Sequence, residues 1–173
     1  TIMNLLGPLA SPARVRRQVV GVASPDLLDL IAGTLAELGH ERALVVHGEP
    51  GLDELSPLGP TRGVRLEGGR LERFDLQPEA LGWSGLEAAE LAGGTPDENA
   101  RLAREVLEGT RRGAARAAVV LNAAAAFYVA GRCDDLEAGI ELARSSLDSG
   151  AALDTLERLR TASRRLADRE AGA

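Results

Sequence analysis

The stretch "QVVGVASPDLLDLIAGTLAELGHERALVVHG", residues 18–48, decides the fold class. Two apolar runs, "QVVGVA" and "RALVVHG", read as short buried strands, and the segment between them has the apolar spacing of a helix. Ser24 suits the N-cap of that helix, Pro25 its first position, and Gly39 its end. Strand, helix and strand within about 30 residues predict a βαβ unit with parallel strands and a right-handed crossover.

The rest of the chain adds a hairpin and a helical half. In residues 61–76, "TRGVRLEGGRLERFDL", apolar and charged residues alternate around Gly68-Gly69, which predicts an antiparallel hairpin. Residues 77–85 read as a loop. Thr95 followed by Glu98 three residues later is typical of a capping box. We predict helices in four segments: 93–109, 112–131, 134–150 and 151–170.

Composition limits the class of protein. The 173 residues are 45% hydrophobic and 27% charged, which indicates one globular domain over residues 1–173. The net charge of −6 argues against nucleic-acid binding, which requires clustered cationic contacts to phosphates. Cys133 is the single cysteine, so the chain has no internal disulfide, and a cytoplasmic location is expected. No apolar run reaches the ~18 residues of a membrane span, so we expect no membrane partner.

An acidic pair follows the second predicted strand. In "ALVVHGEPGLDELSPLG", residues 43–59, Asp53 and Glu54 stand side by side behind Gly48 and Gly51. Ligands of α/β sheets bind beyond the carboxyl ends of parallel strands, and Mg²⁺ is usually held there by one or two carboxylates plus substrate phosphates. The chemistry alone leaves two interpretations equally open: a Mg²⁺ site, or a solvated loop or helix start with acids at its positive end.

The opening segment "TIMNLLGPLASPA", residues 1–13, is a second candidate. Gly7 and Pro8 in an apolar context indicate a tight backbone path against which a flat ligand can pack, and Asn4 offers an amide to a polar substrate group. A buried turn whose amide binds its own backbone is the alternative, and these residues alone favour it.

Neither histidine is expected to act in catalysis. His47 ends a predicted strand, where a local hydrogen bond is more common than a general base. His40, beside Gly39 at a helix end, is expected to cap that helix.

Six segments, in this order, resemble the carboxyl-terminal half of the anthranilate phosphoribosyltransferase family: "TIMNLLGPLASPA", "VVGVASP", "ALVVHGEPGLDELS", "GGTPDENA", "VVLNAAAAFYVAG" and "DLEAGIELARSSLDSGAALDTLERL". The resemblance covers nearly the whole chain. It implies transfer of the phosphoribosyl group of phosphoribosyl pyrophosphate (PRPP) to the amino group of anthranilate, with release of pyrophosphate. It also implies homodimers, and a small helical domain beside a larger α/β domain like that of the pyrimidine nucleoside phosphorylases. For this chain we therefore expect an α/β fold with a mixed, largely parallel sheet flanked by helices.

The resemblance also implies roles for particular residues. The family's Asp-Glu pair binds the Mg²⁺ that accompanies PRPP, which transfers to Asp53 and Glu54. The family's Gly-Pro lines the anthranilate channel, which transfers to Gly7 and Pro8. Asn4 lies in the same motif and is a weaker transfer. No protein nucleophile is needed for this chemistry.

The sequence departs from the family's pattern in the opening segment. Met3 stands where the family usually has Phe, and Ala10-Ser11 where it usually has Thr-Asn. The family's "GTGGD" and "KHGNR" segments, and its helical dimerisation domain, precede the part that this chain resembles. We therefore expect the chain to be a fragment that is inactive by itself.

Three alternatives remain beside the transferase. A non-catalytic, nucleic-acid-binding homologue is disfavoured by the net charge and by the intact "GLDEL" loop. A pyrimidine nucleoside phosphorylase shares the fold but not the "NLLGPL" and "GLDEL" series. The helical segment 95–170 also offers a docking surface, as a structural or interaction domain requires.

Overall fold

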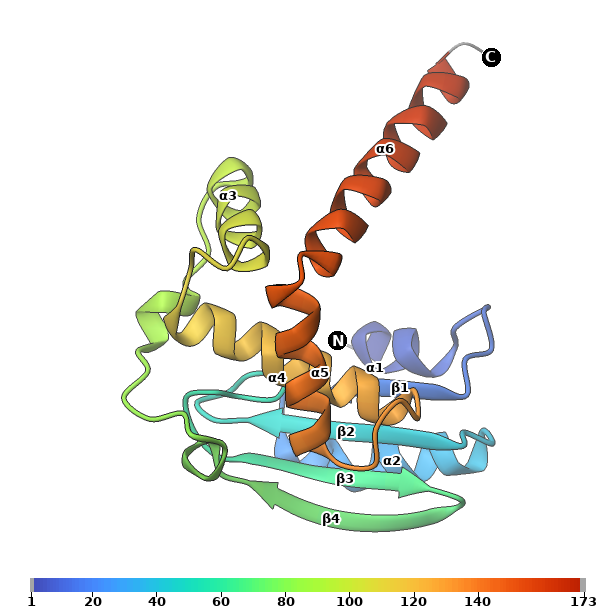
Figure 1. Cartoon of the computed structure of the whole chain (residues 1–173). Helices are drawn as coiled ribbons and strands as arrows, with labels where there is room; N and C mark the ends of the chain where they lie inside the picture. The colour runs from blue at the N-terminus through green and yellow to red at the C-terminus, as the bar shows by residue number, and fades with distance from the viewer. Residues whose placement is uncertain (1, 172–173) are drawn as a thin grey trace.

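Four strands form one mixed sheet in the order β1-β2-β3-β4 (Figure 1). In this computed structural model the backbone of residues 2–171 and the side chains of residues 6–169 are described. The strands are β1 (Arg17–Gly21), β2 (Arg42–Gly48), β3 (Thr61–Glu67) and β4 (Arg70–Leu76). β1 and β2 are parallel, whereas the β2–β3 and β3–β4 pairs are antiparallel. The predicted mixed sheet is confirmed, but among the described strands the parallel share is smaller than expected, because only β1 and β2 are joined by a crossover helix.

Over residues 2–171, six α-helices and three short 3₁₀ helices accompany the sheet. They are α1 (Ile2–Leu9), η1 (Pro25–Leu27), α2 (Leu28–Glu37), η2 (Pro78–Leu81), η3 (Ala88–Leu91), α3 (Pro96–Leu107), α4 (Gly113–Val129), α5 (Leu136–Asp148) and α6 (Ala151–Ala171). α2 covers one face of the sheet and α4 the other (Figure 1). None of the helices in the described part of the chain is long and apolar enough to span a membrane.

The two faces of β2 are both buried, which explains its nearly continuous apolar run. Val45 packs with α2 residues on one face, and Leu44 and Val46 pack with α4 residues on the other. α5 in turn packs on α4, through Ile140 against Val120. Helix α4 is therefore held between the sheet and α5.

Most local signals in the sequence are confirmed. The side chain of Ser24 accepts a hydrogen bond from the backbone N–H of Asp26, but it caps η1, the 3₁₀ helix that leads into α2, and not α2 itself. The Thr95–Glu98 capping box makes both of its bonds. Gly68 and Gly69 form the hairpin turn with positive φ values of 55° and 79°. Residues 77–85, predicted as a loop, contain the short helix η2.

The opening segment differs from the prediction. Gly7 and Pro8 lie inside helix α1 rather than in a turn. Pro8 is one residue before the helix ends, and because it has no N–H, the last turn of α1 lacks one of its regular hydrogen bonds.

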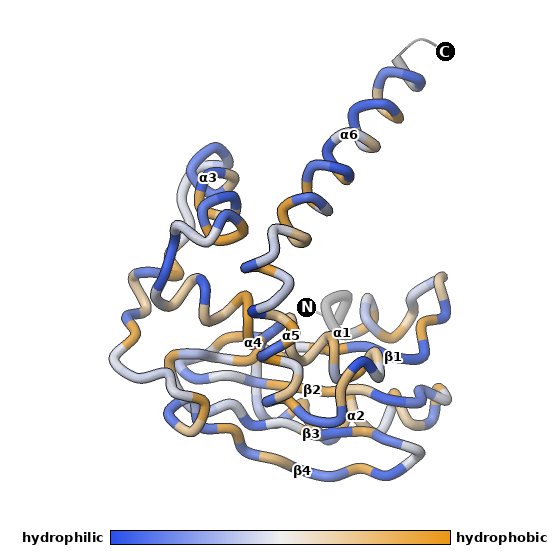
Figure 2. The backbone as a smooth tube through the Cα atoms, viewed as in Figure 1, coloured by the Kyte–Doolittle hydropathy of each residue, from blue (hydrophilic) through white to orange (hydrophobic). Residues whose placement is uncertain are grey.

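Helix α6 extends away from the sheet (Figure 1), and Figure 2 shows that most of it is hydrophilic. Glu157, near its beginning, pairs with Arg104 of α3. Further along, Leu159 is 65% exposed and Leu166 is 56% exposed. The part of α6 from Leu159 onwards therefore contributes little to the core.

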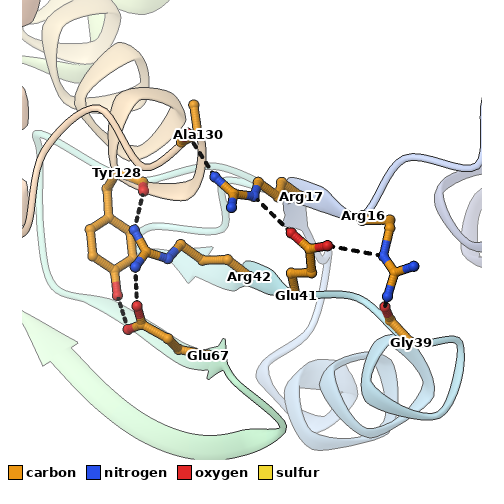
Figure 3. A network of polar contacts seen from close by, with 8 residues as sticks. All are labelled: Arg16, Arg17, Gly39, Glu41, Arg42, Glu67, Tyr128 and Ala130. Carbon is orange, nitrogen blue, oxygen red and sulfur yellow. Dashed lines mark hydrogen bonds and ion pairs between the residues drawn. The ribbon is translucent and has the colours of Figure 1, made fainter.

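A polar network anchors the carboxyl end of α4 to the sheet (Figure 3). Arg42 donates a hydrogen bond to the carbonyl oxygen of Tyr128 at 2.9 Å and forms an ion pair with Glu67. The Glu67 carboxylate also accepts a hydrogen bond from the hydroxyl of Tyr128 at 3.0 Å. Arg17 donates to the carbonyl of Ala130 at 2.9 Å. Both arginines begin strands, so the network joins α4 to the amino ends of β1 and β2.

The same network shifts two pKa values. The hydrogen bond from Tyr128 lowers the pKa of Glu67, and the Arg42 charge acts in the same direction. Burial raises the pKa of Tyr128. The tyrosine therefore stays a neutral donor to an ionised glutamate at neutral pH.

Candidate active site

The loop from Glu49 to Pro60, called the acidic loop below, joins β2 to β3 at the carboxyl ends of β1 and β2. Its first part folds back on β2. Gly48 donates to the carbonyl of Leu52 at 2.9 Å, Leu52 donates to that of Gly48 at 2.6 Å, and Glu49 donates to that of Pro60 at 2.8 Å. The loop therefore closes on itself and does not hang free from the sheet.

Two glycines let the loop approach the strands. A Cβ on Gly21 would overlap the carbonyl oxygen of Asp53 and lie 3.0 Å from its Cα. A Cβ on Gly48 would lie 2.6 Å from the carbonyl oxygen of Glu54. The backbone of both acids thus rests on the carboxyl ends of β1 and β2, at a distance that only glycine permits.

The second part of the loop is held by side chains. Ser56 is buried; its N–H donates to the hydroxyl of Thr61 at 2.9 Å, and its own hydroxyl accepts from Leu58 N–H at 3.1 Å. Leu55 is fully buried, and its backbone N–H and carbonyl both bind the side-chain amide of Asn122 on α4. A helix start does not describe this segment, because its backbone is not helical.

On this fixed backbone the carboxylates of Asp53 and Glu54 are exposed. Glu54 also lines a groove with a volume of about 610 Å³ between α3 and α4. The other lining residues are mostly apolar: Leu91, Gly93, Asn99, Leu102, Ala103, Val106, Leu107, Ala115, Ala118, Val119 and Asn122. Glu54 therefore lies at the rim of a groove large enough for a small molecule, whereas Asp53 does not line it.

The donor set fits a hard divalent cation. Asp53 and Glu54 supply carboxylate oxygens from adjacent positions, as Mg²⁺ prefers. The described residues hold no group of three or more histidine, cysteine, aspartate or glutamate side chains arranged around one metal position. A Mg²⁺ ion here would take its other ligands from water or from phosphate oxygens, which is its usual mode of binding.

The other predicted site residues lie elsewhere. Gly7 is exposed on α1, and Pro8 lines a separate cavity of about 290 Å³ together with Arg14 and His40. The acidic pair does not line that cavity. The side chain of Asn4 lies outside the described residues, as does that of Met3. The substrate-binding role of the opening segment stays a prediction.

Both histidines take the roles that the sequence predicts. His47 is buried, and its Nδ1 lies 2.8 Å from the carbonyl oxygen of Val22, the residue directly after β1. The Nδ1 of His40 lies 3.1 Å from the carbonyl oxygen of Leu35, near the end of α2.

Sequence reasoning missed Asn122. The sequence did contain a sign of its role, because Asn122 is the single amide in the apolar run "AAVVLNAAAAF" of a helix predicted to be buried. A buried amide in such a position needs hydrogen-bond partners, but the sequence does not say that they belong to the acidic loop.

Residues 1–153 match the family model of the glycosyl transferase family, a/b domain. The chain belongs to this glycosyl transferase family. Anthranilate phosphoribosyltransferase from Rubrobacter xylanophilus is 50% identical over 171 residues, which are 99% of this chain and 50% of the relative.

Solved structures of glycosyl transferase relatives agree. Anthranilate phosphoribosyltransferase from Thermus thermophilus superposes with a TM-score of 0.82 at 46% identity, over 91% of this chain and 46% of that one. The Saccharomyces cerevisiae enzyme in complex with PRPP and Mg superposes with a TM-score of 0.80 at 31% identity, over 91% and 45%. The yeast enzyme is also solved in complex with 4-fluoroanthranilate.

The chain spans about half the length of the curated relatives it matches. The resemblance seen in the sequence is confirmed. These comparisons give no support to the phosphorylase or to the nucleic-acid-binding alternative.

Proposed function

We propose that this chain is the carboxyl-terminal part of the α/β domain of an anthranilate phosphoribosyltransferase. The reaction is transfer of the phosphoribosyl group of PRPP to the amino group of anthranilate, with release of pyrophosphate. The observation that carries this proposal is the anchored acidic loop at the carboxyl ends of β1 and β2, in a chain that superposes on enzymes of this name. The yeast complex with PRPP and Mg supports the substrate and the metal.

In this proposal Asp53 and Glu54 hold Mg²⁺ beside the diphosphate of PRPP. When bound, the metal neutralises the charge that develops on the departing pyrophosphate. The chain itself supplies positioning, because the loop backbone rests on Gly21 and Gly48.

The remaining parts of the proposal concern substrate and partners. Gly7, Pro8 and Asn4 are assigned to anthranilate, supported by the resemblance of their segment to the family's channel motif. The complete enzyme is a cytoplasmic homodimer that binds neither nucleic acid nor membrane; the net charge of −6 supports the former exclusion. The chain alone is inactive, since its sequence contains neither "GTGGD" nor "KHGNR".

Calorimetry tests the metal site. PRPP is titrated into the chain with and without Mg²⁺, and into the double variant Asp53→Ala/Glu54→Ala. We expect weak binding that requires Mg²⁺ and disappears in the double variant. The control Asp134→Ala/Glu137→Ala removes the same charge from exposed residues outside the acidic loop and should bind as the unmodified chain does. Equal binding by both double variants would contradict the proposal.

A further inference from the structure

Asn122 makes three hydrogen bonds with its side-chain amide. Its Oδ1 accepts from the N–H of Leu55 at 3.0 Å, and its Nδ2 donates to the carbonyl of Leu55 at 2.9 Å. The Nδ2 also donates to the carbonyl of Ala118, one turn earlier in α4, at 3.0 Å. The amide thus satisfies both backbone groups of one loop residue while it is itself held by its own helix.

The residue that Asn122 holds is the one directly after Glu54. The side chain of Leu55 is fully buried between the sheet and α4, so this residue is fixed through its side chain and both of its backbone groups. With the backbone of Leu55 fixed on one side and that of Asp53 resting on Gly21 on the other, the segment between them has little freedom. The direction in which the two carboxylates leave the backbone is therefore set.

Helix α4 is a suitable support for this contact. Its carboxyl end is bound to the sheet by Arg42 and Arg17, through the carbonyls of Tyr128 and Ala130. Asn122 lies nearly two turns before Tyr128, on the part of α4 that reaches the opposite end of the strands. The helix therefore connects the acidic loop to a network at the other end of the sheet.

We propose that Asn122 is a positioning residue for the metal site: it holds the acidic loop so that Asp53 and Glu54 face one Mg²⁺ together. This inference rests on the proposed function, because it assigns Asn122 to the same site. Asn122 is not itself a ligand in this proposal and acts only through the backbone of Leu55.

Three substitutions separate positioning from simple stability. Asn122→Ala removes all three bonds. Asn122→Asp keeps an acceptor for the N–H of Leu55 but turns a carboxylate oxygen towards the carbonyl oxygens of Leu55 and Ala118, so it should free the Leu55 backbone at least as much as Asn122→Ala does. Val120→Ala removes buried volume on the side of α4 that packs against Ile140, without contacting the acidic loop, and serves as the matched control.

Two measurements are made on each variant of the chain. Amide hydrogen exchange reports the protection of the Leu55 N–H, and Mn²⁺ binding in the presence of PRPP, followed by electron paramagnetic resonance, reports the metal site. For Asn122→Ala we expect exchange at Leu55 at least tenfold faster than in Val120→Ala, and Mn²⁺ binding at least fivefold weaker. Asn122→Asp should show exchange at Leu55 at least as fast as Asn122→Ala does.

The outcomes distinguish the two proposals. If the unmodified chain binds Mn²⁺ with PRPP and Asn122→Ala matches Val120→Ala in both measurements, the positioning role is wrong and the proposed function stands. If the unmodified chain does not bind Mn²⁺ with PRPP, the metal site of the proposed function is overturned, and the role of Asn122 in it as well.

Discussion

The carbonyl oxygen of Asp53 occupies the position that a side chain on Gly21 would take. Gly21 ends β1, and Asp53 lies in the loop that follows β2, so the contact joins the ends of the two parallel strands. An acid that is exposed to solvent is thereby placed by a backbone contact that tolerates no added atom. The geometry of the candidate site depends on this contact as much as on the carboxylates.

Replacing Gly21 with alanine should destabilise the chain. The added methyl group would overlap the Asp53 carbonyl and force the acidic loop away from β1, at a cost of about 1–3 kcal/mol. Gly33→Ala is the matched control, since Gly33 lies within α2 and a Cβ there meets nothing within 4 Å. That change should stabilise the chain by roughly 0.5–1 kcal/mol. Urea unfolding measures both, and a shift of the same sign for the two variants would contradict the prediction.

Leu55→Ala should disturb both the core and the site. Leu55 is 0% exposed, and loss of a fully buried leucine side chain costs about 2–5 kcal/mol. Its backbone also carries the two bonds to Asn122, so we expect faster amide exchange throughout the acidic loop. Leu159→Ala, at a position 65% exposed on α6, should leave the midpoint of thermal unfolding nearly unchanged. If Leu55→Ala lowered the midpoint of thermal unfolding no more than Leu159→Ala does, the packing of the Leu55 side chain in the core would be contradicted.

The local part of this fold could be predicted from sequence, because its signals lie within single segments. Ser24, Gly39 and the Thr95–Glu98 capping box each act within a few residues, and the structure has the elements that they predict. The smaller parallel share of the sheet depends on how separate segments pair, which these signals do not encode.

The candidate site likewise has one part that the sequence predicts and one part that it does not. Asp53 and Glu54 could be named because carboxylates behind a strand suggest a ligand for a cation. The residues that hold this pair in place could not be predicted, because Gly21 lies 32 positions before Asp53 and Asn122 lies 67 positions after Leu55. Close approach between segments so far apart in the sequence leaves no local pattern at either end.

Burial should make Cys133 slow to react. Its thiol is half-buried, and burial raises its pKa, with a further increase from the neighbouring charge of Asp135. Since the thiolate is the reactive form, we expect alkylation by iodoacetamide at pH 8 to be slower in the folded chain than in the urea-unfolded chain. Asp135→Asn keeps an oxygen for the N-cap of α5 and should accelerate the folded-state reaction slightly. Equal alkylation rates in the folded and the unfolded chain would show that burial does not protect the Cys133 thiol.

The bond between Tyr128 and Glu67 predicts a pH-dependent effect on stability. The tyrosine hydroxyl lowers the pKa of Glu67 in the folded chain, so its contribution is present above the pKa of the unfolded glutamate and is lost as the pH falls through the folded value. Tyr128→Phe removes the hydroxyl but keeps the buried ring. Because the side chain of Glu67 is 47% exposed and screened by solvent, we expect a cost of only about 0.5–1 kcal/mol at pH 7.

This cost should begin to shrink as the pH falls below about 4.3, the ordinary pKa of glutamate, and should be lost once the pH is below the lowered pKa of Glu67 in the folded chain. Urea unfolding of the two proteins between pH 3 and pH 7 measures the difference. Glu67→Gln is the control, because it retains an acceptor for the tyrosine hydroxyl without a charge that titrates. In that background, Tyr128→Phe should cost the same at every pH. A difference between Tyr128 and Phe that is constant with pH when Glu67 is present would show that the carboxylate is not the partner of this hydroxyl.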